Sequence, residues 1–110
     1  MLERLTRFLE QHEQVLVITG AGCSTDSGIG DYRDADGNWK RPAPIQHQDF
    51  MHSQSARQRY WARSMAGWPS FAAAKPNAAH TALARLERAG VVTGIITQNV
   101  DRLHQRAGSV

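Results

Sequence analysis

Residues 15–22 read VLVITGAG, a short apolar run that leads straight into a glycine-rich turn. No polar side chain interrupts residues 15–18, and most of them are β-branched. An uninterrupted run of this kind is typical of a strand buried on both faces, as in a parallel sheet. The glycines then predict a turn with little side chain at the carboxyl end of this strand.

A second run of the same kind covers residues 91–97 and ends in the polar stretch Gln98-Asn99-Val100-Asp101. Helical spacing of apolar residues predicts an amphipathic helix over residues 2–13. The same spacing of Trp61, Met65 and Trp68 predicts at least one helix within residues 47–68.

The clearest predicted helix runs from Pro76-Asn77 to Gly90, because proline and asparagine favour a helix start and glycine favours a helix end. Its predicted buried stripe consists of Ala79, Leu83 and Leu86.

The order of strand, glycine turn, helices, strand and polar cluster predicts an α/β fold, the opening part of a Rossmann-like doubly wound parallel sheet. With only two predicted strands, that sheet is incomplete in this chain. The 110 residues suffice for one small domain, and the hydrophobic content of 41% is typical of a globular chain.

Composition excludes several classes of protein. The net charge of +3 is spread over the chain without a Lys/Arg run, so we expect no direct nucleic-acid partner. No apolar run reaches the roughly 18 residues of a membrane span. The single cysteine, Cys23, rules out an internal disulfide and a four-cysteine zinc site within these residues. A reducing cytoplasmic location is the simplest expectation.

The glycine turn at residues 20–22 has two interpretations. It could bring backbone N–H groups to a phosphate, or it could be a tight strand-to-helix connection. The standard dinucleotide fingerprint fails, because Thr25 stands where its third glycine is needed. Ser24, Thr25 and Ser27 could likewise be phosphate ligands or helix caps. Residues 30–44 are rich in Gly, Asp and Pro and predict a long, mobile and functional loop.

Three motifs together resemble those of the sirtuin family. Residues 20–33 read GAGCSTDSGIGDYR, like the family's GAGxS…SGIPDFR. Residues 76–83 read PNAAHTAL, like PNxxHxAL, and residues 97–108 read TQNVDRLHQRAG, like TQNxD-x-LH…AG. The resemblance implies that residues 1–110 are the NAD-binding amino-terminal part of a sirtuin catalytic domain. Such an enzyme transfers an acyl group from a protein lysine to ADP-ribose and releases nicotinamide.

The resemblance also implies a set of residues that bind NAD: Gly20, Ala21, Gly22, Ser24, Thr25, Asp31, Tyr32, Arg33, Gln98, Asn99 and Asp101. In it, residues 20–22 lie against the pyrophosphate and ribose, with Ser24 near a phosphate. Gln98 and Asn99 contact the ribose and the nicotinamide pocket, and Asp101 accepts hydrogen bonds from the nicotinamide carboxamide.

The motif at residues 31–33 implies a cofactor loop, in which the ring of Tyr32 shields the reactive ribose and Arg33 pairs with the cofactor or organises the loop. Two residues depart from the family pattern. Gly30 replaces the usual proline, which gives the loop more backbone freedom. Tyr32 replaces the commoner phenylalanine.

The family's catalytic histidine is expected beyond Val110, and its zinc-binding cysteines further on, so zinc is expected only in the full-length protein. His80 and His104 are interpreted as buried structural histidines. The pair Tyr60 and Arg63 could select acidic acyl groups, as in a related branch of the family; the alternative is a packed tyrosine and a solvated arginine.

Three functions remain open from the sequence. The chain could be part of an NAD-dependent deacylase that is inactive alone and acts on an acyl-lysine protein in its full-length form. It could instead be a non-catalytic module that binds NAD or ADP-ribose. It could also be a truncated chain that does not fold independently.

Overall fold

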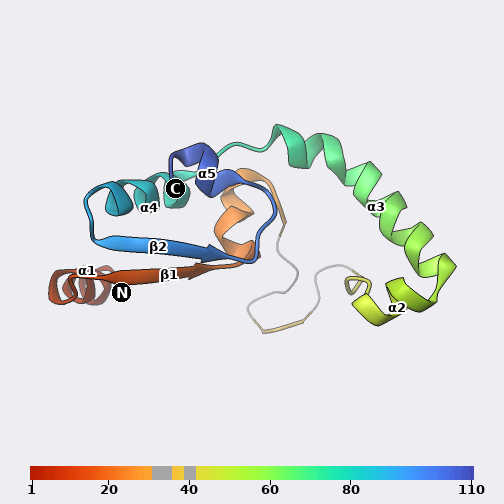
Figure 1. Cartoon of the computed structure of the whole chain (residues 1–110), viewed down its shortest axis with the longest axis horizontal. Helices are drawn as coiled ribbons and strands as arrows, with labels where there is room; N and C mark the ends of the chain where they lie inside the picture. Colours follow the sequence, from red (N-terminus) through yellow and green to blue (C-terminus); the bar gives the residue numbers. More distant parts are fainter. Residues whose placement is uncertain (31–35, 39–41) are drawn as a thin grey trace.

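The computed structural model describes residues 1–30, 36–38 and 42–110, which form two strands with helices before, between and after them (Figure 1). In chain order they are α1 (Leu2–Gln11), β1 (Val15–Thr19), the 3-10 helix η1 (Ala21–Ser27), α2 (His47–His52), α3 (Gln54–Ala73), α4 (Ala78–Arg88), β2 (Val92–Thr97) and α5 (Leu103–Ala107). The predicted α/β class is confirmed. The predicted loop at residues 30–44 falls largely outside the described residues.

β1 and β2 pair in parallel, with Val17 opposite Ile95 and Thr19 opposite Thr97. The two strands therefore end together, and the glycine turn and the polar stretch after β2 emerge at one edge of the sheet. The chain returns from the first strand to the second through α2, α3 and α4, of which α4 packs against β2 (Figure 1). This arrangement is the parallel pair that the two apolar runs predicted.

Only one face of this two-stranded sheet is covered, so the prediction of strands buried on both faces is wrong for these residues. Val92 is 2% exposed, whereas Ile18 is 68% exposed, and Leu16 and Ile96 are exposed beside it. The reason is that α4 packs on one side of the sheet, while α1 contains no buried residue. The exposed face is apolar because its sequence suits a doubly covered parallel sheet.

The helix predicted from Pro76 onward is confirmed as α4, but its buried face differs from the prediction. Ala79 is exposed, and the fully buried residues are His80 and Ala84. Asn77 caps the helix: its Oδ1 accepts from the backbone N–H of Ala79 at 2.9 Å and of His80 at 3.3 Å. His80 completes a capping box, because its Nδ1 accepts from the Asn77 N–H at 3.1 Å. The buried face of α4 therefore includes a polar side chain, the imidazole of His80.

α2 and α3 form an arm that extends away from the sheet (Figure 1). The spacing of Trp61, Met65 and Trp68 correctly predicted the helix α3, but all three side chains are exposed. Ser53 separates the two helices of the arm and caps α3 by accepting from the Ala56 N–H at 3.2 Å. None of the described helices has both the length and the apolar character that crossing a membrane requires.

The uncovered sheet face predicts that the 110-residue chain binds hydrophobic dye and self-associates. Replacing Ile18, which is already 68% exposed, by serine should reduce both effects and change the free energy of unfolding little. The control Val92→Ala, on the covered face, should lower that free energy by about 1–3 kcal/mol. Dye fluorescence, light scattering and denaturant titration check this. Equal effects of the two substitutions on stability would contradict the assignment of faces.

Candidate functional site

The candidate site lies where both strands end, because parallel strands present their carboxyl ends at one edge. The pairing continues past the strands, where the Gln98 N–H donates to the Thr19 carbonyl at 3.1 Å. The Asn99 side-chain amide donates to the Gly20 carbonyl at 2.9 Å. These two bonds hold the glycine turn against the polar stretch that follows β2.

Ser24 and Asp101 form the shortest side-chain link across this edge. The Ser24 hydroxyl donates to Asp101 Oδ2 at 2.6 Å, and the Leu103 N–H donates to Asp101 Oδ1 at 2.9 Å. Ser24 is 0% exposed and Asp101 is half-buried, so the bond between them is partly shielded from water. A hydrogen bond to a charged group under these conditions contributes about 1.5–3 kcal/mol.

His80 extends this link into the interior. Its Nδ1 accepts from the Asn77 N–H, so Nε2 carries the proton of the neutral ring and donates to Ser24 Oγ at 3.4 Å. The order His80, Ser24, Asp101 differs from a Ser-His-Asp triad, in which the histidine stands between the other two. Ser24 here gives its proton to a carboxylate and has no surface exposure, so it is a positioning residue and not a nucleophile.

A second set of hydrogen bonds joins Thr19 and Thr97, the last residues of the two strands. The Thr19 hydroxyl donates to Thr97 Oγ1 at 2.9 Å, and Thr97 Oγ1 also accepts from the Asn99 N–H at 3.0 Å. Since Thr19 donates its proton, His104 Nε2 donates to the Thr19 oxygen at 2.8 Å. His104 is 3% exposed, and its Nδ1 has no hydrogen-bond partner among the described residues. His80 and His104 are therefore both buried and hydrogen-bonded, as the sequence predicted.

Burial favours the neutral forms of two ionisable groups beside these hydrogen bonds, His80 and Cys23. Burial, reinforced by the neighbouring His104, lowers the pKa of His80, although the Asp101 carboxylate acts in the opposite direction. Burial raises the pKa of the Cys23 thiol, and Asp101 adds to this effect. At neutral pH the interior therefore holds a neutral imidazole and a protonated thiol beside one carboxylate.

The structure brings together most of the residues that the resemblance assigned to the cofactor. Those within the described residues are Gly20, Ala21, Gly22, Ser24, Thr25, Gln98, Asn99 and Asp101. A Cβ added to Gly22 would meet nothing within 4 Å, so the space beside that glycine is open. Gln98 is exposed, and its Oε1 lies 3.8 Å from the Cβ position of Gly20. Asp31, Tyr32 and Arg33 lie outside the described residues.

Ser24 and Thr25, which could be phosphate ligands by sequence, have hydroxyl groups that are already bonded within the protein. Ser24 is fully enclosed and bonded to Asp101, so it does not face the open space beside Gly22. Thr25 is exposed, but its hydroxyl donates to the Gly22 carbonyl at 2.6 Å. Neither residue caps η1, which has no side-chain cap: the Thr25 hydroxyl bonds within the helix, and Ser24 links η1 to Asp101.

Tyr60 and Arg63 lie on the α2–α3 arm, apart from the strand ends (Figure 1). The Tyr60 ring packs edge-on against Phe50, with centroids 5.1 Å apart, and the Arg63 guanidinium donates to the Ala43 carbonyl at 3.3 Å. Both side chains have local partners. The structure therefore does not bring this pair to the site at the strand ends.

Sequence reasoning missed the paired hydroxyls of Thr19 and Thr97 and the part played by Asn77. Asn77 Nδ2 donates to the Cys23 carbonyl at 2.8 Å and to Ser27 Oγ at 3.1 Å, which ties η1 to α4. The threonines could have been found, because each closes an apolar run directly before the site. The contacts of Asn77 with η1 had no sequence signal, since its partners Cys23 and Ser27 lie 54 and 50 residues away.

Comparison with known proteins gives a consistent result. The model of the Sir2 family matches residues 20–110. The chain is 62% identical over 105 residues to the NAD-dependent protein deacetylase of Xanthomonas axonopodis pv. citri, covering 96% of this chain and 36% of that protein. It is 62% identical over 107 residues to the NAD-dependent protein deacetylase of Bordetella pertussis, covering 97% and 39%. The chain thus spans well under half the length of these relatives.

Solved structures agree over the whole chain. A Sir2 homologue in complex with ADP ribose superposes with a TM-score of 0.81 at 38% identity, covering 100% of this chain and 44% of that one. Sir2 bound to acetylated peptide gives a TM-score of 0.77 at 36% identity, covering 100% and 42%. The described elements therefore match part of the Rossmann-like domain of these proteins.

The lowered pKa of His80 predicts a specific pH dependence of folding. As the pH falls, the unfolded chain takes up this proton first, near the ordinary histidine pKa of about 6.5. The contribution of neutral His80 is therefore complete above that pH and lost as the pH falls toward the lowered folded value. The groups that face His80 are His104, Asp101 and Cys23.

The substitution His80→Gln should flatten the loss of stability between pH 7 and pH 5, because glutamine at this position can preserve the capping box without titrating. Denaturant titrations at several pH values would show it. His52→Gln, at an exposed site on α2, is the matched control and should keep the wild-type dependence. If wild type and His80→Gln lost stability equally between pH 7 and pH 5, the assignment of this loss to His80 would be contradicted.

Proposed function

The chain belongs to the Sir2 family, and we propose that it forms the NAD-binding amino-terminal part of an NAD-dependent protein lysine deacylase. The observation that carries the proposal is the Ser24–Asp101 hydrogen bond of 2.6 Å, which joins the glycine turn after β1 to the polar stretch after β2. The relatives named above are NAD-dependent protein deacetylases, which supports the same cofactor and reaction class here.

The residues at the strand ends fit a dinucleotide. The open space beside Gly22 leaves room for a phosphate close to the backbone, and larger side chains at residues 20–22 would narrow that approach. The exposed Gln98 side chain lies next to this turn, where it can reach a ribose hydroxyl. We propose that residues 20–22 and Gln98 hold the pyrophosphate and ribose.

Asp101 is suited to bind the nicotinamide carboxamide. An ionised carboxylate offers about four acceptor positions, and Ser24 and the Leu103 N–H occupy two of them. The remaining positions can accept the amide N–H₂ group. Because both existing bonds fix the carboxylate, it meets the ligand in a set orientation, and little ordering is needed on binding. Asn99, held by the Gly20 carbonyl, completes the same pocket in this proposal.

When bound, NAD supplies the ribose carbon that takes the acyl oxygen as nicotinamide leaves. This chain's part is to bind and orient the cofactor. Among the described residues, His80 and His104 are buried and internally bonded and cannot reach a substrate, so we propose that the general base acting on the ribose hydroxyls lies elsewhere in the full-length protein. Asp31, Tyr32 and Arg33 are proposed for the cofactor loop on the resemblance alone.

The substrate, the zinc site and the acyl selectivity of the whole protein are also proposed on the resemblance alone. An acyl-lysine protein is its substrate; among the similar structures is Sir2 bound to acetylated peptide. The single cysteine of this chain does not fit the family's four-cysteine zinc site, so that site would lie elsewhere in the protein. Selection of acidic acyl groups by Tyr60 and Arg63 would require these residues to exchange their present local partners.

A second candidate is a module that binds NAD or ADP-ribose without catalysis. Its support is that the described cofactor residues gather at one edge of the sheet, while the two histidines described beside them are buried. Turnover of an acetylated peptide by the full-length protein separates the two functions, because a binding module would bind the nucleotide and release no nicotinamide.

In the full-length protein, Asp101→Asn should reduce nicotinamide exchange by at least about tenfold, because it removes the charge that the carboxamide would meet. The melting temperature should change much less, since asparagine preserves the side chain's shape. Asp26→Asn, at an exposed position in η1, is the matched control and should leave exchange unchanged. Proportional losses of exchange and melting temperature would indicate a purely structural role for Asp101.

The isolated 110-residue chain should show no NAD-dependent turnover of an acyl peptide. Without a positioned general base, the reaction loses a contribution of about 10²–10⁴-fold. Release of nicotinamide by the chain and by the full-length protein, compared at equal concentration, measures this. Turnover by the chain at a comparable rate would place a catalytic base within these residues.

A further inference from the structure

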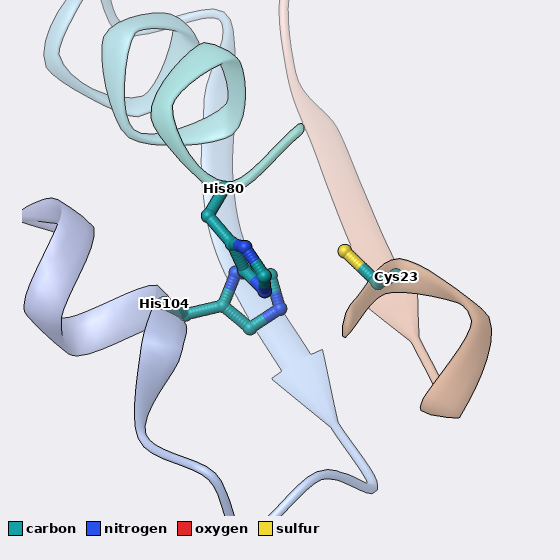
Figure 2. Close-up of side chains that lie close together, drawn as sticks. All are labelled: Cys23, His80 and His104. Carbon is teal, nitrogen blue, oxygen red and sulfur yellow. The ribbon is translucent and has the colours of Figure 1, made fainter. Parts of the chain in front are cut away.

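Cys23, His80 and His104 come from three separate elements, η1, α4 and α5, and the Cys23 thiol points toward the two imidazoles (Figure 2). One ligand atom from each, the cysteine Sγ and a ring nitrogen of each histidine, lies within 4.8 Å of the other two. The two rings stand edge to face, with centroids 4.9 Å apart. A thiolate with two imidazoles is a ligand set that suits Zn²⁺ and related ions.

His104 is prepared to act as a ligand. Its Nε2 donates to the Thr19 hydroxyl, so Nδ1 carries a free lone pair. That Nδ1 is buried and has no hydrogen-bond partner among the described residues. Metal-binding histidines are commonly oriented in this way, with the second ring nitrogen donating to a fixed acceptor. A buried, unpartnered acceptor is otherwise unfavourable, and a cation would satisfy it.

His80 can join the site after one proton moves. Its Nδ1 now accepts from the Asn77 N–H, and its Nε2 carries the proton. Coordination through Nε2 requires that proton to move to Nδ1, where it faces the Asn77 N–H donor, so the capping bond breaks and the two groups must move apart. The loss of one helix cap is small compared with the free energy that a zinc ion contributes at a site with cysteine and histidine ligands.

We propose that Cys23, His80 and His104 form a binding site for a thiophilic divalent cation such as Zn²⁺ or Cd²⁺, with water in the fourth position. On binding, Cys23 releases its thiol proton to solvent and forms the metal–sulfur bond, so one proton leaves for each ion bound. The half-buried Cys23 gives the ion its route inward, because both histidines are buried behind it. The ligands must approach one another slightly, since metal–ligand bonds of about 2.0–2.3 Å are shorter than the present spacing allows.

Binding of the metal ion would also affect the candidate NAD site at the strand ends. A metal on His80 Nε2 removes its hydrogen bond to Ser24, and Ser24 in turn holds Asp101. The ion should therefore inhibit NAD-dependent turnover. This consequence rests on the proposed function, whereas binding of the ion does not.

Cd²⁺ titration of the full-length protein, already loaded with its own zinc, tests the site. Wild type should bind one more ion per chain than Cys23→Ser by equilibrium dialysis, with an ultraviolet cadmium–thiolate band that the variant lacks. Cys23→Ala is the second variant, used if serine prevents folding, and the melting temperature without added metal confirms that each variant is folded. His52→Ala removes an exposed histidine on α2 and should leave the additional ion bound.

Equal stoichiometry and equal affinity in wild type and in a folded Cys23 variant would overturn the proposal. Cd²⁺ should inhibit turnover at least about tenfold more strongly in wild type than in the Cys23 variant. Cysteine-dependent binding without inhibition would keep the metal site and reject its link to Ser24. Binding in a protein that has no NAD-dependent activity would reject the proposed function and leave the metal site intact.

Discussion

The hydrogen bond between the Ser24 hydroxyl and the Asp101 carboxylate connects two segments that are 77 residues apart in the chain. A partly buried carboxylate is stable only when hydrogen-bond donors surround it, and here the Ser24 hydroxyl and the Leu103 N–H fill that need. Because Ser24 lies in η1 and Leu103 begins α5, both elements are fixed relative to the end of β2. The position of the glycine turn follows from this constraint.

The parallel pairing of β1 and β2 makes that bond possible. Thr19 lies opposite Thr97 in the register, so the two strands reach the same edge and their hydroxyls can bond directly. A shift of one residue would turn these side chains to the opposite face of the sheet. Asn77 then fixes α4 to η1, which places His80 behind Ser24. Polar contacts organise this edge, while the apolar core of the described residues is small.

The sequence predicted the features that arise from local patterns: both strands, the helices α1, α3 and α4, and the concentration of polar residues after residue 97. It predicted burial of Leu16 and Ile18 less well, because burial depends on what else covers the sheet. Ala79 was placed on the buried face of α4 by its apolar character, but His80 occupies that face because Ser24 and Asn77 satisfy its ring nitrogens. Such polar burial depends on distant partners and has no local signal. The cofactor residues were identified from motif resemblance, and geometry alone brought Thr19 and Thr97 into the same network.

The most direct test of this account is a double-mutant cycle on NAD affinity in the full-length protein, with Ser24→Ala, Asp101→Ala and the double variant. If Ser24 acts by holding Asp101, the double variant should bind about as weakly as Asp101→Ala alone, with a coupling free energy of about 1.5–3 kcal/mol. Independent effects, with free-energy losses that add to within about 0.5 kcal/mol, would show that the two residues act separately and would contradict the account.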